Sequence, residues 1–303
     1  MYNELLKTFL TVVDTGSFSK ASQHLYISTV AVSKQINQLE DIVGVRLLQR
    51  SPRGVSLTTA GTFFAKQAQS FINTGNNIIR QTQQIADTSK VNIRVGSSLM
   101  RPAKLLLDQW AASPELAQKY DLSLVPFDDD PKSIDQVFQQ LGNTIDLFVG
   151  PYNYSMPNYG DSSFFHLFDY PCECGVPITN PLVKKEQLTI NDLNQQHFAL
   201  LKKGLSPKLD QLRQQIKLKS PHIKIIDVDT YYDTDVFNQA LNHDFLIETL
   251  PIWKNVHPGI VNKPIDWDIT MPYGIIYSSN ASQVVRKFIE KIGNQLREKN
   301  PLK

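Results

Sequence analysis

Residues 16–61 decide the fold of the N-terminal part of the chain and read GSFSKASQHLYISTVAVSKQINQLEDIVGVRLLQRSPRGVSLTTAG. Serine is a preferred residue just before the first turn of a helix, because its hydroxyl accepts a hydrogen bond from a free backbone N–H group. Ser19 and Ser28 can each take this role, and Tyr26-Ile27 between them is a candidate turn. The stretch therefore predicts two helices joined by a tight turn.

The second of these helices has two different faces. At about 100° per residue, one narrow arc holds the apolar residues Val32, Ile36 and Leu39. The opposite arc holds Val30, Ser33, Lys34 and Asn37. Short or hydrogen-bonding side chains near the start of such a helix suit the major groove of DNA and its phosphate oxygens. This pattern predicts a helix-turn-helix, although a three-helix domain whose polar face is merely solvated would show the same arcs.

A hairpin is expected directly after these helices. Strand-like residues 46–49 and 55–57 flank the turn Ser51-Pro52-Arg53-Gly54. Arg50 and Arg53 lie around this turn, where they suit the DNA backbone or the adjacent minor groove.

A long helix is expected from Thr58 to Asp87, a stretch without proline in which Thr58 can cap the N-terminus. Its apolar and small residues recur at alternating spacings of four and three, at Phe64, Ala68, Phe71, Gly75, Ile78, Thr82 and Ile85. Such a seam favours pairing with a second helix. Gly75 in the interior costs about 1 kcal/mol relative to alanine, which is tolerable where a partner helix approaches closely. The alternative is a helix that packs on its own domain.

Beyond residue 90 the pattern alternates between strands and helices. Strands are expected at 91–95, 122–125, 145–149, 197–201, 223–228, 245–247 and 273–277, and helices at 102–112, 130–141, 207–216, 231–242 and 282–299. Alternation of this kind indicates mostly parallel sheets covered by helices. The number of elements suits two small α/β lobes, with chain crossings expected near Ser162 and Pro264.

Composition limits the class of protein. The chain has 303 residues, 41% of them hydrophobic, which is enough for two or three compact units. Residues 1–90 carry nine basic and five acidic side chains, whereas the remainder carries 22 and 24. A basic first domain hints at a polyanionic partner. Charged residues within the first fifteen positions argue against a secretory signal, and no apolar run suits a membrane span, so we expect a cytoplasmic protein without a membrane partner.

The N-terminal residues resemble the LysR-type transcriptional regulators. The residues that carry this resemblance stand in register without a gap: Phe9, Val12, Gly16-Ser17-Phe18, Ala21, Leu25, Ser28, Val32-Ser33, Gln35-Ile36, Leu39-Glu40, Gly44, Leu47, Arg50, Arg53, Leu57-Thr58 and Ala60-Gly61. The resemblance implies an α+β multidomain fold with an N-terminal winged helix-turn-helix, a long linker helix and a C-terminal two-lobed α/β effector domain like that of periplasmic binding proteins. The expected boundaries are 1–59, 60–89 and 90–303, with lobe I at about 90–162 and 265–303 and lobe II at about 163–264.

The family reads DNA with the start of the second helix and with the wing. Together with the outer arc, this points to Thr29, Val30, Ser33, Lys34, Gln35, Asn37, Arg50 and Arg53 as DNA-binding residues. Three of them depart from the family, which usually has glutamine at Thr29, proline or a small residue at Val30 and arginine at Lys34. Because lysine lacks the bidentate geometry of arginine, we expect Lys34 to contact phosphate more than bases.

The resemblance also implies an assembly. The linker helix would pair antiparallel with that of a second subunit, giving a homodimer, and dimers would associate into a homotetramer. A symmetric dimer predicts an operator with inverted half-sites on double-stranded DNA. RNA polymerase is a further expected partner.

The C-terminal part resembles an effector-binding domain through its order of elements. Ligands in such two-lobed folds bind between the lobes, at strand ends and helix starts. The turn at 97–101 offers backbone N–H groups, hydroxyls and an arginine, which suit an anionic effector or form an ordinary helix cap. The expected effector-binding residues are Ser97, Ser98, Leu99, Met100, Arg101, Phe127, Asp128, Pro151, Tyr152, Lys202, Leu205, Thr230 and Tyr231.

Other classes of function find little support in the sequence. Cys172 and Cys174 share one strand face, but neighbouring ligands with metal spacing are missing, so buried structural cysteines are expected. The sequence contains no HExxH, GxSxG, GxGxxG or Walker-type motif, so we expect neither an enzyme nor a cofactor. A small-molecule binding or transport protein that does not bind DNA is the alternative, and it leaves the first 90 residues unexplained.

Overall fold

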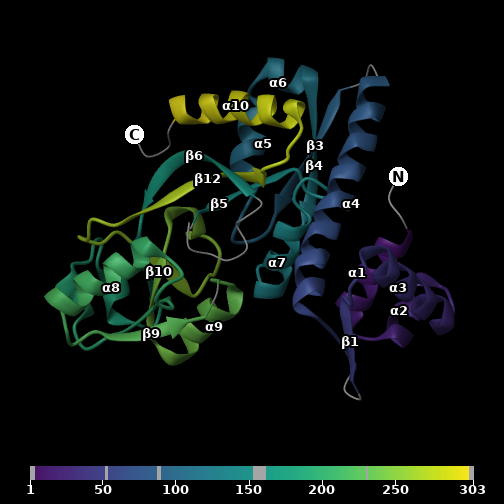
Figure 1. The fold of residues 1–303 in the computed structure, drawn as a ribbon. Helices are drawn as coiled ribbons and strands as arrows, with labels where there is room; N and C mark the ends of the chain where they lie inside the picture. The colour runs from purple at the N-terminus through teal and green to yellow at the C-terminus, as the bar shows by residue number, and fades with distance from the viewer. Residues whose placement is uncertain (1–3, 52–53, 87–89, 153–161, 230, 300–303) are drawn as a thin grey trace. The chain divides into compact units, whose positions relative to one another are not determined.

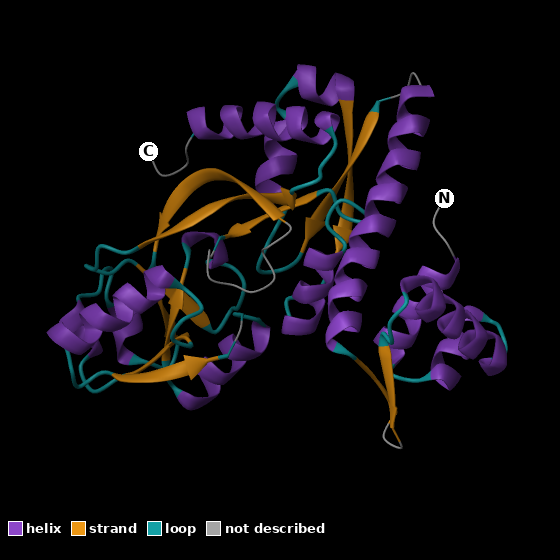
Figure 2. Cartoon of the chain, viewed as in Figure 1, coloured by secondary structure: helices purple, strands orange, loops and turns teal. Residues whose placement is uncertain are grey.

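The computed structural model describes residues 4–51, 54–86, 90–152, 162–229 and 231–299. The chain forms two compact units, residues 1–87 and residues 88–303. Figure 1 shows the order of their elements along the chain, and Figure 2 marks helices and strands by colour.

The first unit contains three short helices, a hairpin and a long helix. Its elements are α1 (Glu4–Thr15), α2 (Phe18–Leu25), α3 (Thr29–Val43), β1 (Leu48–Ser51), β2 (Gly54–Leu57) and α4 (Thr59–Ala86). The inner arc predicted for α3 is buried, with Val32, Ile36 and Leu39 at 4% exposure or less. These side chains pack with Phe9 and Val12 of α1 in one apolar core. The helix-turn-helix is thus fixed by the burial of the arc that the sequence indicated.

The helix caps agree with the sequence at α3 and differ from it at α2. Ser28 Oγ accepts a hydrogen bond from Ala31 N at 3.1 Å, as expected. At α2 the cap is Ser17, whose Oγ accepts from Lys20 N at 3.4 Å, and the expected cap Ser19 lies within the helix. The expectation for Ser19 was wrong because α2 begins directly after Ser17, which has the extended backbone that a capping residue needs.

The long helix α4 is tied to the rest of the first unit at its N-terminus. Thr58 Oγ1 accepts a hydrogen bond from Gly61 N at 2.8 Å, which confirms the predicted cap. A Cβ atom on Gly61 would lie 1.9 Å from Leu47 O, so only glycine permits this approach of α4 to the strand. The rings of Phe64 and Phe9 meet edge to face at 5.5 Å. The helix therefore starts from a fixed position on the helix-turn-helix.

The second unit contains two five-stranded sheets within its described residues. The first sheet has the order β4-β3-β5-β12-β6. Its strands are β3 (Val91–Ser97), β4 (Tyr120–Pro126), β5 (Leu147–Pro151), β6 (Ser162–Pro171) and β12 (Thr270–Ser278). Strands β4, β3 and β5 are parallel, whereas β12 is antiparallel to both of its neighbours. The helices of this lobe are α5 (Lys104–Ala111), α6 (Pro114–Lys119), α7 (Pro131–Gln139) and α10 (Gln283–Glu298).

The second sheet has the order β11-β7-β10-β8-β9 and forms the other lobe. Its strands are β7 (Glu173–Pro177), β8 (His197–Leu201), β9 (Lys224–Val228), β10 (Leu246–Thr249) and β11 (Ile260–Lys263). Helix α8 (Pro207–Lys219) packs on β8, and helix α9 (Thr234–His243) packs on β10 and β11. Three short 3-10 helices complete the lobe: η2 (Pro181–Lys184), η3 (Ile190–Leu193) and η4 (Pro251–Trp253).

The chain passes twice between the two sheets. Strand β6 pairs with β12 as far as Pro171, and β7 of the second sheet begins at Glu173. The first crossing thus lies beyond the expected position at Ser162, because the apolar residues after it continue a strand of the first sheet. The return crossing lies between Lys263, where β11 ends, and Thr270, where β12 begins.

Candidate nucleic-acid interface and ligand pocket

The outer face of α3 projects from the first unit. Val30 is 79% exposed, and Thr29, Lys34 and Asn37 are exposed beside it, whereas Ser33 is half-buried. A cluster of exposed short and basic side chains at the start of a helix can enter a groove of duplex DNA. The structure thus brings five of the predicted DNA-binding residues onto one surface.

Two predicted DNA-binding residues also hold the domain together. Gln35 Oε1 accepts a hydrogen bond from Thr8 Oγ1 of α1 at 2.5 Å, and the hydroxyls of Thr29 and Ser22 lie 3.1 Å apart. The amide oxygen of Gln35 is therefore engaged within the domain. Both contacts fix the rotation of α3 about its own axis, and this rotation decides which side chains face outward.

The wing is anchored to α3 by a buried carboxylate. Glu40 accepts hydrogen bonds from Leu47 N at 2.7 Å, Leu48 N at 3.0 Å and Arg46 Nη1 at 2.6 Å. Although burial by itself raises the pKa of Glu40, the Arg46 guanidinium and the two backbone N–H groups hold it below its ordinary value. Glu40 thus fixes where β1 leaves the end of α3. Arg50 lies on β1 opposite Val55, while its side chain and Arg53 lie outside the described part of the structure.

One exposed aromatic side chain was missed by the sequence argument. Tyr26 is 94% exposed and takes a left-handed backbone conformation with φ of 55° in the turn between α2 and α3. A ring held out beside the start of α3 can contact the sugar-phosphate backbone next to the groove. The sequence signal was a large aromatic residue in a tight turn, where small polar residues are usual.

In the second unit, the turn that was expected to hold an anion is occupied by a carboxylate of the protein itself. Asp129 accepts hydrogen bonds from Ser98 Oγ at 2.7 Å, Met100 N at 2.9 Å and Arg101 Nη1 at 2.6 Å. Ser97 Oγ accepts from Ala103 N at 3.2 Å. Groups that could have bound an external anion are thus paired with one another or with Asp129.

The other expected effector positions are spread over several environments. Phe127 packs edge to face on Phe148, and Tyr152 stacks on Phe164 with ring centroids 4.2 Å apart. The remaining positions are exposed at Leu99, Asp128 and Lys202, half-buried at Leu205, and outside the described residues at Thr230. Among the described ones, none lines the pocket between the lobes.

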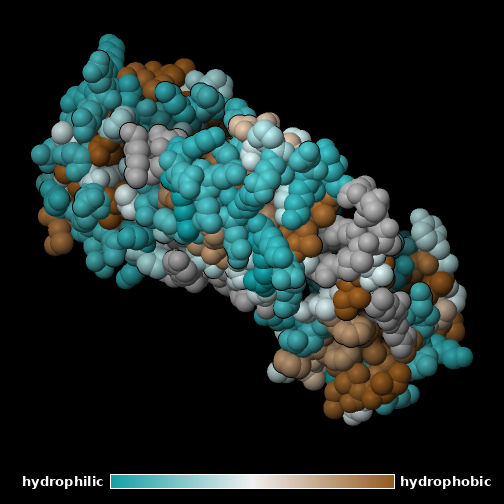
Figure 3. Space-filling model, turned by 90° about the horizontal axis from the view of Figure 1, so that it is seen from above, coloured by the Kyte–Doolittle hydropathy of each residue, from teal (hydrophilic) through white to brown (hydrophobic). Residues whose placement is uncertain are grey.

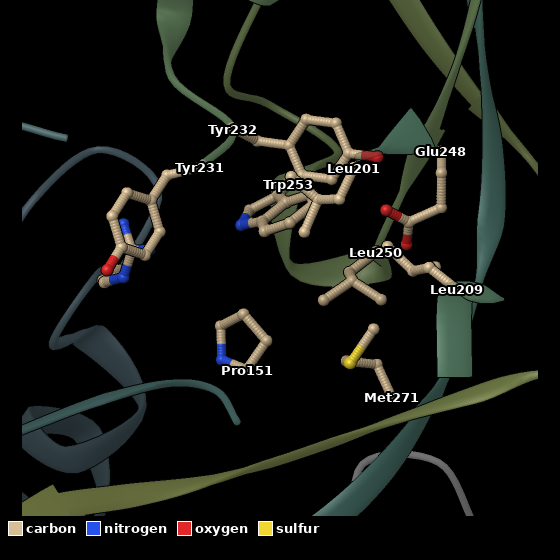
Figure 4. A pocket seen from close by; sticks show the side chains of 10 residues that line it. Pro151, Leu201, Leu209, Tyr231, Tyr232, Glu248, Leu250, Trp253 and Met271 are labelled. Carbon is tan, nitrogen blue, oxygen red and sulfur yellow. The ribbon is translucent and has the colours of Figure 1, made fainter. Parts of the chain in front are cut away.

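A pocket lies where the two lobes meet. It is partly open to solvent and is lined by Arg101, Pro151, Leu201, Leu209, Tyr231, Tyr232, Glu248, Leu250, Trp253 and Met271. Three of these were expected from the sequence, namely Arg101, Pro151 and Tyr231. In Figure 4, Tyr231 and Glu248 stand on opposite sides, with Tyr232 and Trp253 on one wall and Pro151 and Met271 on the other. Ends of parallel strands from both sheets supply this site, at Pro151, Leu201 and Glu248.

Two contacts connect the lobes at this pocket. Trp253 Nε1 of the second lobe donates a hydrogen bond to Met100 O of the first at 2.8 Å. The guanidinium of Arg101 lies 5.9 Å from the ring centroid of Tyr231. A change in the content of the pocket thus acts on residues that join the lobes.

The polar end of the pocket is formed by Glu248, which is 1% exposed on the fully buried strand β10. Burial raises its pKa to about 7, and interactions with Tyr232 and Cys172 only partly oppose this effect. Those groups lie near enough to interact, yet the Tyr232 hydroxyl and Glu248 Oε1 have no hydrogen bond of ordinary geometry among the described residues. The carboxyl points into the pocket in Figure 4 with unused hydrogen-bonding capacity.

The described part of the chain lacks two features, a cluster of metal ligands and a membrane-spanning helix. Its His, Cys, Asp and Glu side chains form no group of three that could hold a metal ion. Its helices are all too short or too polar to cross a membrane. Cys172 and Cys174 are free thiols and are buried.

The fold and the two sites define a class of protein: a winged helix-turn-helix joined through a long helix to a two-lobed α/β domain with a pocket between its lobes. Residues 3–62 match the model of the bacterial regulatory helix-turn-helix proteins of the lysR family. The N-terminal domain is therefore similar to the helix-turn-helix domain of that family, as the sequence motif indicated.

Relatives with a known name are similar over about a third of the chain. The chain is 40% identical over 101 residues to the HTH-type transcriptional activator AllS of Klebsiella pneumoniae, which is 33% of this chain and 37% of AllS. It is 34% identical over 110 residues to the HTH-type transcriptional regulator HdfR of Salmonella newport, covering 36% of this chain and 38% of HdfR. These matches span little more than a third of each relative.

Solved structures extend the likeness to the whole fold. CbnR, a LysR family transcriptional regulator, superimposes with a TM-score of 0.71 at 18% identity over 98% of this chain and 99% of CbnR. Full-length CbnR complexed with its target DNA gives a TM-score of 0.68 at 16% identity over 98% and 100% of the two chains. A full-length OxyR variant from Pseudomonas aeruginosa gives 0.58 at 19% identity over 98% and 95%. The chain thus has the fold of LysR-type regulators throughout.

Proposed function

We propose that this protein is a LysR-type transcription regulator that binds an inverted-repeat operator through its first unit and whose DNA binding is modulated by a small molecule in its second unit. The observation that carries the proposal is the outer face of α3, where Val30, Lys34 and Asn37 are exposed on a helix whose opposite arc is buried. The match of residues 3–62 to the lysR family supports it, as does the fold shared with CbnR, whose complex with DNA has been solved.

The geometry supports DNA as the partner in three ways. The first turn of α3 after the cap at Ser28 lies at the surface, with Thr29 and Val30 exposed. Lys34 adds a positive charge on the same face. Glu40 holds the wing beside this helix at a fixed angle. Together these features present a helix and a hairpin to adjacent grooves of one duplex.

The experiment that tests this function measures the binding of the purified full-length chain to labelled DNA fragments from around its own gene. We expect retardation of at least one fragment, with an affinity that falls steeply as salt rises because phosphate contacts release counterions. A shuffled duplex of equal length is the control. Failure to retard any fragment at low ionic strength overturns the proposal.

We propose further that the protein is a homodimer, or a tetramer of such dimers, paired through α4. Phe71 and Ile78 of the predicted seam lie one heptad apart and are 58% and 49% exposed in the single chain. Exposed apolar side chains in such a repeat favour a second helix. Figure 3 colours one face of the molecule by hydropathy, with apolar side chains in brown among hydrophilic ones in teal.

The dimer is tested by sedimentation of Phe71→Glu. We expect this variant to sediment as a monomer and to lose cooperative operator binding. Leu218→Glu is the matched control, because Leu218 is also an exposed apolar residue of a helix, at 84% exposure, but lies on α8 of the second unit. Equal sedimentation of wild type and Phe71→Glu contradicts pairing through α4.

The pocket of the second unit is proposed as the effector site, and the protein as a cytoplasmic regulator without catalytic activity. The two lobes meet at the pocket through Trp253 and Met100, so a ligand that favours one lobe arrangement shifts the population toward it. A partnership with RNA polymerase is also proposed, because AllS is named as a transcriptional activator.

A further inference from the structure

The charges around the pocket are unevenly compensated. Arg101 lines one side, but its guanidinium already donates to the buried carboxylate of Asp129 at 2.6 Å. Glu248 lines the other side, and no arginine or lysine forms an ion pair with it among the described residues. A ligand that enters therefore meets a neutralised cation at one end and a carboxyl group without a counter-ion at the other.

The position of Glu248 suits a group that binds a ligand. It is 1% exposed, its Oε1 has no hydrogen-bond partner of ordinary geometry in the described structure, and Figure 4 shows its carboxyl directed into the pocket. The Tyr232 hydroxyl, equally without such a partner, points toward the same place. Leaving buried polar groups unsatisfied is costly, so a structure that keeps two together beside a cavity gains when a ligand donates to them.

We propose that the pocket binds an organic cation, a primary ammonium group on an apolar or aromatic body, with the ammonium at Glu248 and the body between Tyr231 and Trp253. This inference rests on the proposed function, in that it names the chemical class of the effector. It reverses the charge expected from the turn at 97–101, whose donors are used by Asp129.

An ammonium group matches the polar end in the direction of its hydrogen bonds. It has three donors and no acceptor, whereas the unused groups are a carboxyl oxygen and a hydroxyl oxygen, both of which accept. A charge-assisted bond to Glu248 is stronger than a bond between neutral groups. An anionic ligand would place its charge against this carboxyl inside a buried site, which is unfavourable.

The rest of the pocket suits the body of such a ligand. Tyr231, Tyr232 and Trp253 contribute aromatic rings, whose faces attract cations as well as apolar groups. Leucine and methionine side chains complete the wall at Leu201, Leu209, Leu250 and Met271. Because Trp253 also donates to Met100 of the other lobe, a body that packs on this ring acts on the contact between the lobes.

The test titrates the full-length protein with propylamine, butylamine and 2-phenylethylamine, and with the alcohol and carboxylate of each body. Binding is followed by calorimetry and by tryptophan fluorescence. We expect at least one amine to bind at least tenfold more tightly than both its alcohol and its carboxylate. If no amine binds, or if a carboxylate binds more tightly than its amine, the proposal is overturned. This comparison uses the wild-type chain and does not depend on a variant.

Two variants test whether the cation binds at Glu248. Glu248→Gln keeps the shape but removes the charge, and we expect it to weaken amine binding at least tenfold. Glu173→Gln is the control, because Glu173 lies on β7 beside β10, is half-buried and does not line the pocket. Unchanged amine binding in Glu248→Gln overturns the placement.

DNA binding measured on the same preparations separates this inference from the proposed function. If the protein retards its operator but binds carboxylates more tightly than amines, the proposed function stands and the proposed cation site is rejected. If the protein binds amines but no DNA fragment, the proposed function is rejected and the proposed cation site stands.

Discussion

Arg101 Nη1 lies 2.6 Å from Asp129 Oδ1, and both side chains are almost removed from solvent, at 10% and 6% exposure. The same carboxylate accepts hydrogen bonds from Ser98 Oγ and Met100 N. One internal anion thus organises the turn between β3 and α5, from which Arg101 reaches the pocket and Met100 O reaches Trp253. Asp129 holds the first lobe's side of the ligand site in place without entering it.

Asp129→Asn should therefore destabilise the second unit. Removing one partner of a buried ion pair leaves the other charge uncompensated, at a cost of about 3–5 kcal/mol. Chemical unfolding followed by tryptophan fluorescence reports on this unit, since all three tryptophans lie in it. Asp128→Asn is the matched control because its side chain is exposed. Equal midpoints for the two variants would show that the buried pair contributes nothing.

Glu40→Gln should lower both the stability of the first unit and its affinity for DNA. The side chain amide keeps one acceptor but loses the charge that receives three donors, and charged hydrogen bonds are each worth about 1.5–3 kcal/mol. Because the folded-state pKa of Glu40 is lowered, its stabilising contribution is present above the ordinary carboxyl pKa and is lost as pH falls through the folded value. Calorimetric unfolding between pH 3 and pH 7 should show a smaller acid-dependent loss in the variant.

The control for Glu40 is Asp41→Asn, which removes an exposed carboxyl from the next position of α3. Operator affinity should fall for Glu40→Gln and change little for Asp41→Asn, since only Glu40 orients the wing. If both variants instead raised operator affinity to the same extent, the removal of a negative charge, rather than the position of the hairpin, would govern binding.

Much of the fold could be predicted from the sequence, because the spacing of apolar residues indicates which face of a helix or strand is buried. The arc at Val32, Ile36 and Leu39 and the cap at Thr58 are found as predicted. Strands β6, β7 and β11 were not predicted; β7 carries glycine and proline within five residues, and β11 is four residues long. The cap at Ser19 failed because two serines flank Phe18 and sequence spacing alone cannot choose between them.

The ligand pocket was harder to predict because its residues come from distant strands and loops. Arg101, Pro151 and Tyr231 follow from the rule that ligands bind at strand ends, whereas Glu248, Trp253 and Met271 do not. A signal for Glu248 existed in the sequence: a carboxylate within the otherwise apolar run Phe245-Leu246-Ile247-Glu248. The role of Asp129 could not be seen, since its partners lie about thirty residues away along the chain.

Lys34→Ala should weaken DNA binding uniformly over operator variants. Lys34 is exposed on the outer face of α3, and an ammonium group contacts phosphate as a point charge rather than reading a base by two parallel bonds. The dependence of log affinity on log salt should lose about one unit of slope. Lys132→Ala is the control, since it removes an exposed lysine from α7 of the second unit. Loss confined to one base position would show that Lys34 reads sequence.

Glu248→Gln should flatten the pH dependence of stability of the second unit. The folded-state pKa of Glu248 is raised from 4.5 to about 7, chiefly by burial. Between these values the folded chain keeps a proton that the unfolded chain releases, so wild-type stability falls as pH rises across this window. The full difference corresponds to about 3 kcal/mol, at 1.36 kcal/mol per pKa unit. The nearby Tyr232 and Cys172 titrate well above this window, because burial raises the pKa of both.

The measurement is urea unfolding of the full-length chain between pH 4 and pH 8, followed by tryptophan fluorescence. Relative to wild type, Glu248→Gln should gain stability as pH rises, because the glutamine has no proton to lose. Glu186→Gln, at an exposed position, should run parallel to wild type at every pH. If Glu248→Gln also runs parallel, the pKa of Glu248 is the same in the folded and the unfolded chain, and a partner inside the folded protein would then have to offset the effect of its burial even without a ligand.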